Sequence, residues 1–234
     1  MRINRVAIKQ NAKSIISTAQ PSPILIGLAY LGIIFILQFL SYTVSGEFQV
    51  YMKAMEQVMA GNIDYIPPII NISLSARLMM LAIGLMILMM DTGFIVYCLN
   101  ICQFKKAGIG NLFDGCAIFF KVLWLVIIMF ILVFFWSLLL IVPGIIAAYR
   151  YRMAIYLQIE NPKLGAFECI RESSKMMEGH KGELFVLDLS FIGWNLLTLF
   201  PFVTIWVTPY TNITYVNYYI ALRDMPKPSF DRLV

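Results

Sequence analysis

Six runs of apolar residues follow one another along the chain, separated by short polar segments. A run of about 20 apolar residues can cross a bilayer as a helix, and no polar segment is long enough to fold as a separate soluble domain. The pattern predicts an all-α fold, a polytopic membrane helical bundle of six transmembrane helices that forms one domain over residues 1–234. The predicted spans are 24–40, 78–102, 116–142, 145–160, 184–199 and 202–222.

Amphipathic segments flank these spans. Residues 1–20 are basic and predict an interfacial N-terminal helix, because their apolar residues recur at helical spacing. A stretch near 48–59, in the longest interval between spans, predicts a short amphipathic helix followed by a loop. The apolar face of the N-terminal helix comprises Ile8, Ala12, Ile15 and Ile16.

A further amphipathic helix is predicted on the cytoplasmic side, between the fourth and fifth spans. Asn161-Pro162 supplies an N-cap and a first-turn proline, and Gly179 is expected to end the helix. Its predicted apolar face carries Leu164, Phe167, Ile170 and Met177.

The fourth apolar run differs from the others because it is short and cationic. About 16 residues make a helix of only about 24 Å, and Arg150 and Arg152 flank Tyr151 in it. Pro143-Gly144 is expected to close the third span in a sharp hairpin. Two arginines facing acyl chains are unfavourable, so we expect the fourth run to be wrapped by its neighbours, between spans two and five.

Buried acids are the expected partners of these arginines. Residues two apart on a helix point about 200° apart, so the arginines need different neighbours. At about 1.5 Å per residue, Asp91 lies at the depth of Arg150, and Arg152 can reach Asp188. We therefore predict the pairs Asp91–Arg150 and Asp188–Arg152, either as structural ion pairs that fix helix register or as a site for a headgroup, a solute or a proton.

The last two spans add uncharged polar residues to the candidate set. The sixth span is the most polar and is suited to packing inside a bundle, with a kink at Pro209. The remaining buried polar candidates are Asn195, Tyr210, Asn212 and Asn217.

Composition and charge agree with a lipid environment. The chain is 60% hydrophobic and 13% charged with a net charge of +5, whereas an ordinary soluble domain is about a quarter charged. Lysines and arginines are spread along the loops and are not gathered with aromatic residues on one face, which argues against a nucleic-acid partner. Because only Lys53 and Arg77 fall in loops on the other side, we expect both termini to be cytoplasmic and the lipid bilayer, including anionic headgroups, to be a partner.

Motifs for chemistry are weak. Asp91-Thr92-Gly93 spells the aspartic-protease triplet, but the second carboxylate that catalysis needs is expected well away from it. Cys98, Cys102 and Cys116 gather near one boundary without a histidine beside them, so packing is a better interpretation than zinc. We therefore expect no catalytic residue, no cofactor and no metal.

Three stretches carry a resemblance to a known family. The segment 138–151, LLLIVPGIIAAYRY, resembles the hairpin signature of a bacterial multi-pass membrane family catalogued as domain of unknown function 975. The segment 185–194, FVLDLSFIGW, resembles a second signature of that family, and Pro209-Tyr210 with Thr214-Tyr215 resembles a third. The likeness extends from the turn at 112–115 onward.

The resemblance implies a six-span protein of the bacterial cytoplasmic membrane, distantly similar to the membrane domain of some glycerophosphodiester phosphodiesterases. It implies no established activity. Arg150, Asp188 and Tyr210 stand at family-type positions, and Asp91 is a departure from the family pattern. The resemblance also leaves open that Arg150, rather than Arg152, pairs with Asp188.

Three classes of function follow. The first is a non-catalytic membrane module, serving envelope integrity or binding a membrane protein partner. The alternative is a small-solute or lipid transporter that uses the buried arginine and aspartate pairs, favoured by the short fourth span and the Pro209 kink. An enzyme acting on lipid headgroups is the third class, and it rests on the phosphodiesterase-associated resemblance alone.

Overall fold

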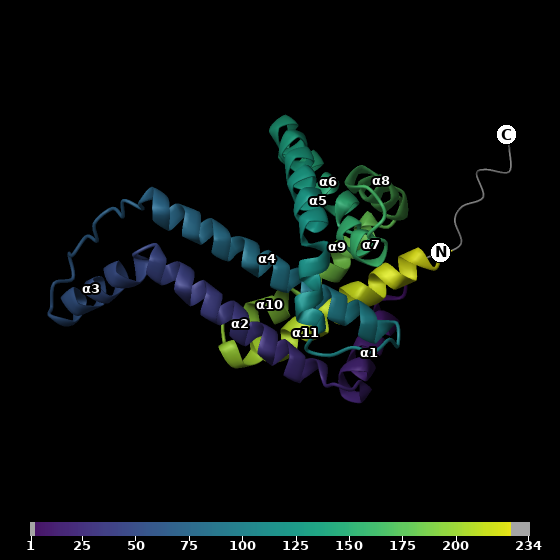
Figure 1. Cartoon of the computed structure of the whole chain (residues 1–234), viewed down its shortest axis with the longest axis horizontal. Helices are drawn as coiled ribbons and strands as arrows, with labels where there is room; N and C mark the ends of the chain where they lie inside the picture. Colours follow the sequence, from purple (N-terminus) through teal and green to yellow (C-terminus); the bar gives the residue numbers. More distant parts are fainter. Residues whose placement is uncertain (1–2, 226–234) are drawn as a thin grey trace.

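The computed structural model describes residues 3–225, and within that range all regular structure is helical (Figure 1). This confirms the all-α expectation. The helices are α1 (Arg5–Thr18), α2 (Pro23–Val44), α3 (Glu47–Met59), α4 (Leu74–Cys102), α5 (Asn111–Leu139), α6 (Ile141–Tyr151), α7 (Ala154–Glu160), α8 (Ala166–Met176), α9 (Lys181–Leu189), α10 (Ile192–Leu197) and α11 (Pro201–Arg223).

Two helical hairpins project from a common base. Helices α2 and α4 run side by side as one arm with α3 at its far end, and α5 and α6 form a second arm that leaves the base in a different direction (Figure 1). Three helices, α2, α4 and α5, are long and apolar enough to cross a membrane. Large apolar side chains are exposed along all three, as expected for surfaces that contact lipid.

The two arms meet where α4 crosses the beginning of α5, and glycines make this crossing possible. A Cβ atom added at Gly93 would collide with the backbone of Leu112, and one added at Gly115 would collide with the carbonyl oxygen of Met89. Small residues at a crossing allow two helix backbones to approach closely, which is the main source of attraction between helices in lipid. The crossing therefore depends on hydrogen as the side chain at both positions.

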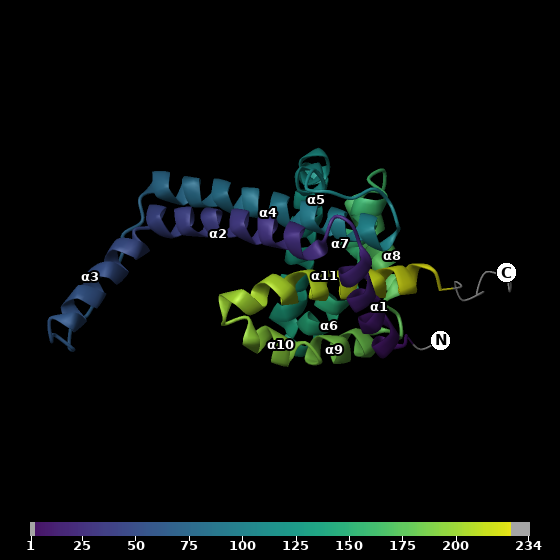
Figure 2. The same cartoon turned by 90° about the horizontal axis from the view of Figure 1, so that it is seen from below.

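The base is formed by the shorter helices around α11. Helix α11 contacts α1, α2 and α4, and Pro209 in its first half faces Gly27 of α2 (Figure 2). The predicted apolar face of α1 is confirmed, because Ile8, Ala12 and Ile15 are buried. The apolar face of α1 was expected at the membrane interface. In the structure this face packs against α11.

The fourth apolar run is not one helix. It is divided into α6 and α7 by a break at Arg152 and Met153, and the reversal after α5 occurs at Leu140, whose backbone is extended. The reversal was predicted at Pro143-Gly144, and it occurs three residues earlier in the sequence, at Leu140. Pro143 lies in the first turn of α6, where a missing N–H costs no helical hydrogen bond.

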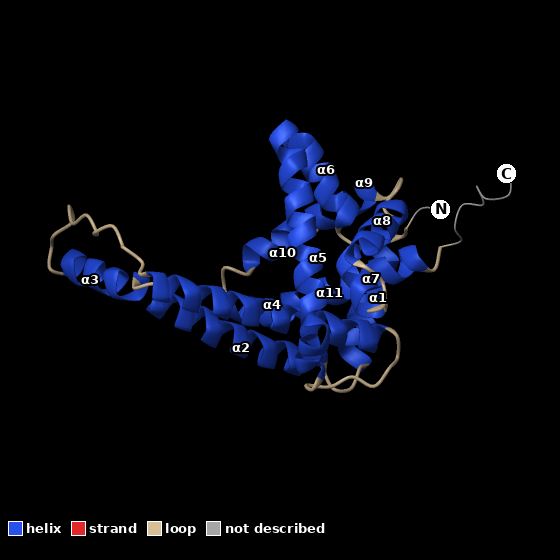
Figure 3. Ribbon diagram, turned by 45° about the horizontal axis from the view of Figure 1, so that its top comes forward, coloured by secondary structure: helices blue, strands red, loops and turns tan. Residues whose placement is uncertain are grey.

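The surroundings of this run also differ from the prediction. Helix α7 is buried against α5 and α8, but α6 lies at the periphery, with Ile141 and Ile145 exposed. The principal neighbours of α4 are α5, α2 and α11, and neither α6 nor α7 is among them, so the fourth run does not lie between spans two and five (Figure 3). The predicted position of the fourth run depended on an Asp91–Arg150 ion pair. Asp91 has a different partner, Tyr30 of α2.

The remaining segments differ from the prediction at their ends. The fifth run is divided into α9 and α10, whereas the sixth is one helix, α11, that continues through Pro209. Helix α8 begins after Gly165, whose N–H donates to the Glu168 side chain at 2.9 Å, and not at Asn161. Its predicted apolar face is partly wrong, since Phe167 is exposed; the residues that α8 buries are Cys169, Ile170 and Ser173.

Candidate functional site

The best-defined polar site is centred on Asp188 in α9. Its carboxylate accepts hydrogen bonds from the hydroxyls of Tyr215 in α11, at 2.6 Å, and Tyr149 in α6, at 2.8 Å. A guanidinium nitrogen of Arg152 lies 3.7 Å from the same carboxylate. We call these four residues the Asp188 cluster; it joins the segments that the sequence predicted as spans four, five and six.

Arg152 is the residue that follows α6, at the break before α7. Its guanidinium lies 4.9 Å from the centroid of the Tyr215 ring. The side chain of Arg152 is 42% exposed and that of Asp188 is 21% exposed. The predicted Asp188–Arg152 pair is thus confirmed. The Arg152 side chain is the more exposed partner of the pair.

Aromatic rings and a lysine border the cluster just beyond the end of α9. Phe191 packs against Tyr215 and Tyr210, and Lys9 of α1 lies 4.4 Å from its ring centroid while donating to the Ser190 hydroxyl at 2.6 Å. Burial lowers the pKa of the Lys9 ammonium below its usual value, and the nearby charges of Lys13 and Arg5 lower it further. The N-terminal helix is therefore tied to the same region of the bundle.

A second carboxylate cluster lies at the end of α7. Glu160 accepts hydrogen bonds from Gln103, at 2.6 Å, and from the Tyr219 hydroxyl, and it forms an ion pair with Arg223. We call these residues the Glu160 cluster. It connects the ends of α4, α7 and α11, and Tyr219 lies one helical turn beyond Tyr215 on the same face of α11.

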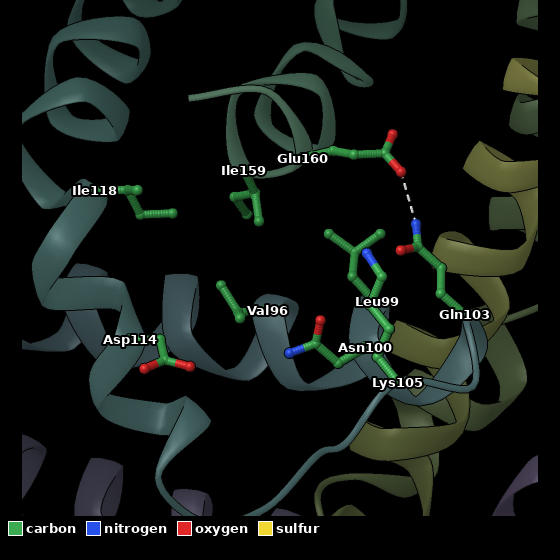
Figure 4. Close-up of a pocket in the computed structure, with 9 residues that line it drawn as sticks. All are labelled: Val96, Leu99, Asn100, Gln103, Lys105, Asp114, Ile118, Ile159 and Glu160. Atoms are coloured by element: carbon green, nitrogen blue, oxygen red, sulfur yellow. Dashed lines mark hydrogen bonds between the residues drawn. The ribbon is translucent and has the colours of Figure 1, made fainter. Parts of the chain in front are cut away.

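A hollow of about 200 Å³ opens beside Glu160, between α4, α5 and α7 (Figure 4). Val96, Leu99, Ile118 and Ile159 supply its apolar lining. Its polar lining comes from Asn100, Gln103, Lys105, Asp114 and Glu160, with Gln103 and Glu160 bonded to each other across one side.

Asp91 does not pair with Arg150, which corrects the first predicted ion pair. The Tyr30 hydroxyl of α2 donates to its carboxylate at 2.6 Å, and the Tyr30 ring stacks on Phe94. Arg150 is exposed, and no acid lies within ion-pair distance of it among residues 3–225. A tyrosine can satisfy a carboxylate in an apolar helix pair without bringing in a second charge.

The uncharged candidates are dispersed through the last two segments. Asn195 is exposed on α10, contrary to its predicted burial. Tyr210 is half-buried between Phe191 and Trp194, and Asn212 donates to the Thr208 carbonyl at 2.9 Å. Asn217 is 7% exposed and accepts from the Asn11 side chain at 3.5 Å. None of the four touches Asp188.

Cysteines and metal ligands add no site to the described part of the chain. Cys98, Cys102 and Cys169 are buried and Cys116 is exposed, all as free thiols. Within residues 3–225, no group of three or more histidine, cysteine, aspartate or glutamate side chains could hold a metal ion.

Comparison with protein families shows which of these clusters lie in a segment that matches a known family. Residues 138–225 match the family described as Protein of unknown function (DUF975). The match runs from the end of α5 to the end of α11, and the turn at 112–115 lies outside it. No curated protein and no solved structure matches the chain, so the likeness to a phosphodiesterase membrane domain stays a sequence-based interpretation.

All four residues of the Asp188 cluster lie within the DUF975 segment. Three residues of the Glu160 cluster also lie there, and Gln103 does not. Asp91 and its partner Tyr30 both lie outside the segment. The Asp188 cluster is therefore the candidate site of the DUF975 segment itself.

Sequence reasoning missed several members of these clusters although signals were present. Tyr149 stands beside Arg150 in the 138–151 stretch, and a tyrosine hydroxyl can satisfy a buried acid as a charged group does. Glu160 ends the fourth run and Arg223 directly follows the sixth, so two opposite charges at one predicted boundary signalled a pair. Tyr30 gave no such signal, because it is one aromatic residue in an apolar run.

Proposed function

We propose that the chain is a non-catalytic integral membrane module of the bacterial cytoplasmic membrane, serving envelope integrity or the binding of a membrane protein partner. The observation that carries the membrane assignment is the exposure of large apolar side chains along three helices of 22 to 29 residues. Such surface is unfavourable in water and favourable in lipid.

The hydrogen bonding of the buried acids supports a structural role. Asp188 has two tyrosine hydroxyls and an arginine, Glu160 has an amide, a hydroxyl and an arginine, and Asp91 has a tyrosine. Hydrogen bonds to the ionised carboxylate stabilise its charged form and hold it in place, which suits a structural role. The clusters fasten the short helices of the DUF975 segment to α11.

The six-span topology with both termini cytoplasmic belongs to the same proposal. Its support comes from the helices outside the α5–α6 arm, which leaves in a different direction. The α3 end of the α2–α4 arm and the α10–α11 turn extend toward one end of the molecule, and α1, α8 and the end of α11 gather at the other (Figure 2). The loop at 60–73 is then external, and the loop at 103–110 is cytoplasmic.

Reporter fusions test this topology. Fusions of alkaline phosphatase after Gly61 and after Lys106 should be active and inactive respectively, because the enzyme folds only outside the cytoplasm. Membranes should also retain the protein after alkaline carbonate washing. Release by carbonate, or an inactive fusion at Gly61 with an active one at Lys106, contradicts the proposal.

Arg152 favours a second function, the binding of an anionic headgroup or solute for transport. Its guanidinium is 42% exposed and 3.7 Å from Asp188, which leaves donors directed away from the acid. A phosphate group could accept hydrogen bonds from these donors.

Lipid copurification tests the second function. If Arg152 binds an anionic headgroup, the protein purified in mild detergent should carry a defined anionic lipid that is lost in Arg152→Gln and kept in the control Lys175→Gln. Mass spectrometry of the bound lipids checks this. An unchanged lipid content in Arg152→Gln contradicts a headgroup site there and leaves the structural role of the cluster.

A further inference from the structure

Helix α3 has no buried residue, yet it is clearly amphipathic. Most of its apolar residues recur three and four positions apart and lie along one face, whereas Lys53 lies opposite that face and Gln49 and Glu56 lie along its edge. The apolar face consists of Phe48, Tyr51, Met52, Met55, Val58 and Met59. A helix with this pattern has its apolar face covered by something other than water.

The direction of that face is set where α3 leaves α2. Gly46 separates the two helices with a φ of +82°, a backbone conformation that favours glycine and bends the chain. The ring of Phe48 lies 5.6 Å from that of Phe39 and 6.0 Å from that of Tyr42, both in α2. The apolar face of α3 therefore begins against α2 at Phe48, and the rest of that face is exposed.

The contact of Phe48 with α2 adjoins surface that lipid would cover. Phe39, which contacts Phe48, is itself 48% exposed, and it belongs to α2, one of the three helices able to cross a membrane. Lipid that surrounds the end of α2 would thus lie under the face that carries Phe48. The polar residues of α3 then point away from the bilayer.

The loop that returns from α3 lies at the same end of the arm (Figure 3), and it carries several exposed apolar side chains. Ile63, Ile66 and Ile69 are almost fully exposed, and the side chain of Ile70 packs near Gly46 at the bend. Isolated apolar side chains on a surface are ordinary, but an amphipathic helix and a loop with three exposed isoleucines gather many of them at one end of the arm.

We propose that α3 is an interfacial helix that lies on the outer surface of the membrane, with its apolar face at the boundary between headgroups and acyl chains. The proposal rests on the membrane location and on the topology proposed above. The polar face carries both signs of charge, Lys53 and Glu56, so apolar burial rather than attraction to anionic lipid holds the helix there. Binding by apolar burial is insensitive to salt.

Fluorescence quenching in vesicles tests the proposal. Met55→Cys and Lys53→Cys, on opposite faces of α3, are each labelled with an environment-sensitive fluorophore in a Cys116→Ser background, where the other cysteines are buried. In phosphatidylethanolamine and phosphatidylglycerol vesicles, nitroxide-bearing lipids should quench the label at 55 several times more strongly than the label at 53. Aqueous iodide should show the reverse order, at low and at high salt.

Two other results would overturn the inference. If iodide quenches both labels equally while the protein resists carbonate and keeps an external loop at 60–73, α3 does not lie on lipid although the membrane module stands. If energy transfer between labelled copies rises while lipid quenching at 55 is absent, a second copy of the chain covers the face. Release of the protein by carbonate would instead refute the proposed function itself.

Discussion

Gly93→Ala is expected to destabilise the protein strongly, although it adds only one methyl group. The added Cβ would lie against the backbone of Leu112, and backbone atoms of a helix cannot move aside as a flexible side chain can. Overpacking of this kind costs about 1–3 kcal/mol, and we expect the upper end here. For a chain of this size the midpoint of thermal unfolding in detergent should fall by roughly 6–12 °C.

Gly84→Ala in the same helix is the matched control. No atom lies within 4 Å of the position that its Cβ would take, so the substitution adds helix propensity without a collision. The gain should be about 0.5–1 kcal/mol, and the unfolding midpoint should stay or rise slightly. Equal effects of Gly93→Ala and Gly84→Ala would show that α4 and α5 do not cross closely at Gly93.

This crossing illustrates what the sequence did and did not predict. Long apolar runs mark α2, α4 and α5 because hydrocarbon length is a local property of the chain. A glycine in an apolar run does not reveal which helix it faces, since that depends on tertiary packing. The sharp contact of Gly93 with Leu112 therefore appears only in the structure.

The same reasoning explains the candidate site. Asp188 and Arg152 were predicted as partners because two opposite charges in apolar surroundings need each other, and depth along a helix is readable from residue number. The breaks at Arg152 and Ser190 were not predicted, since each arises where a short helix turns to pack on its neighbours. Nor were the tyrosine donors, because the hydroxyl of an aromatic residue is as often an interface anchor as a partner of a carboxylate.

Tyr215→Phe is expected to lower stability through the loss of one hydrogen bond to the Asp188 carboxylate. Hydrogen bonds to charged groups contribute about 1.5–3 kcal/mol, so the unfolding midpoint should fall by roughly 5 °C. Tyr210→Phe is the matched control in the same helix, because no hydrogen bond of its hydroxyl is formed within the described residues. Its midpoint should change by less than about 2 °C.

A double-mutant cycle tests whether the charge of Asp188 gives this bond its strength. In an Asp188→Asn background the Tyr215 hydroxyl faces a neutral amide, so Tyr215→Phe should cost about 1 kcal/mol less than in the unmodified protein. Thermal unfolding of the four proteins measures the coupling. Additive losses would mean that Tyr215 and Asp188 are not bonded in the folded protein. The attachment of α9 to α11 would then depend on other contacts, such as the hydrogen bond from the Tyr218 hydroxyl to the His180 carbonyl.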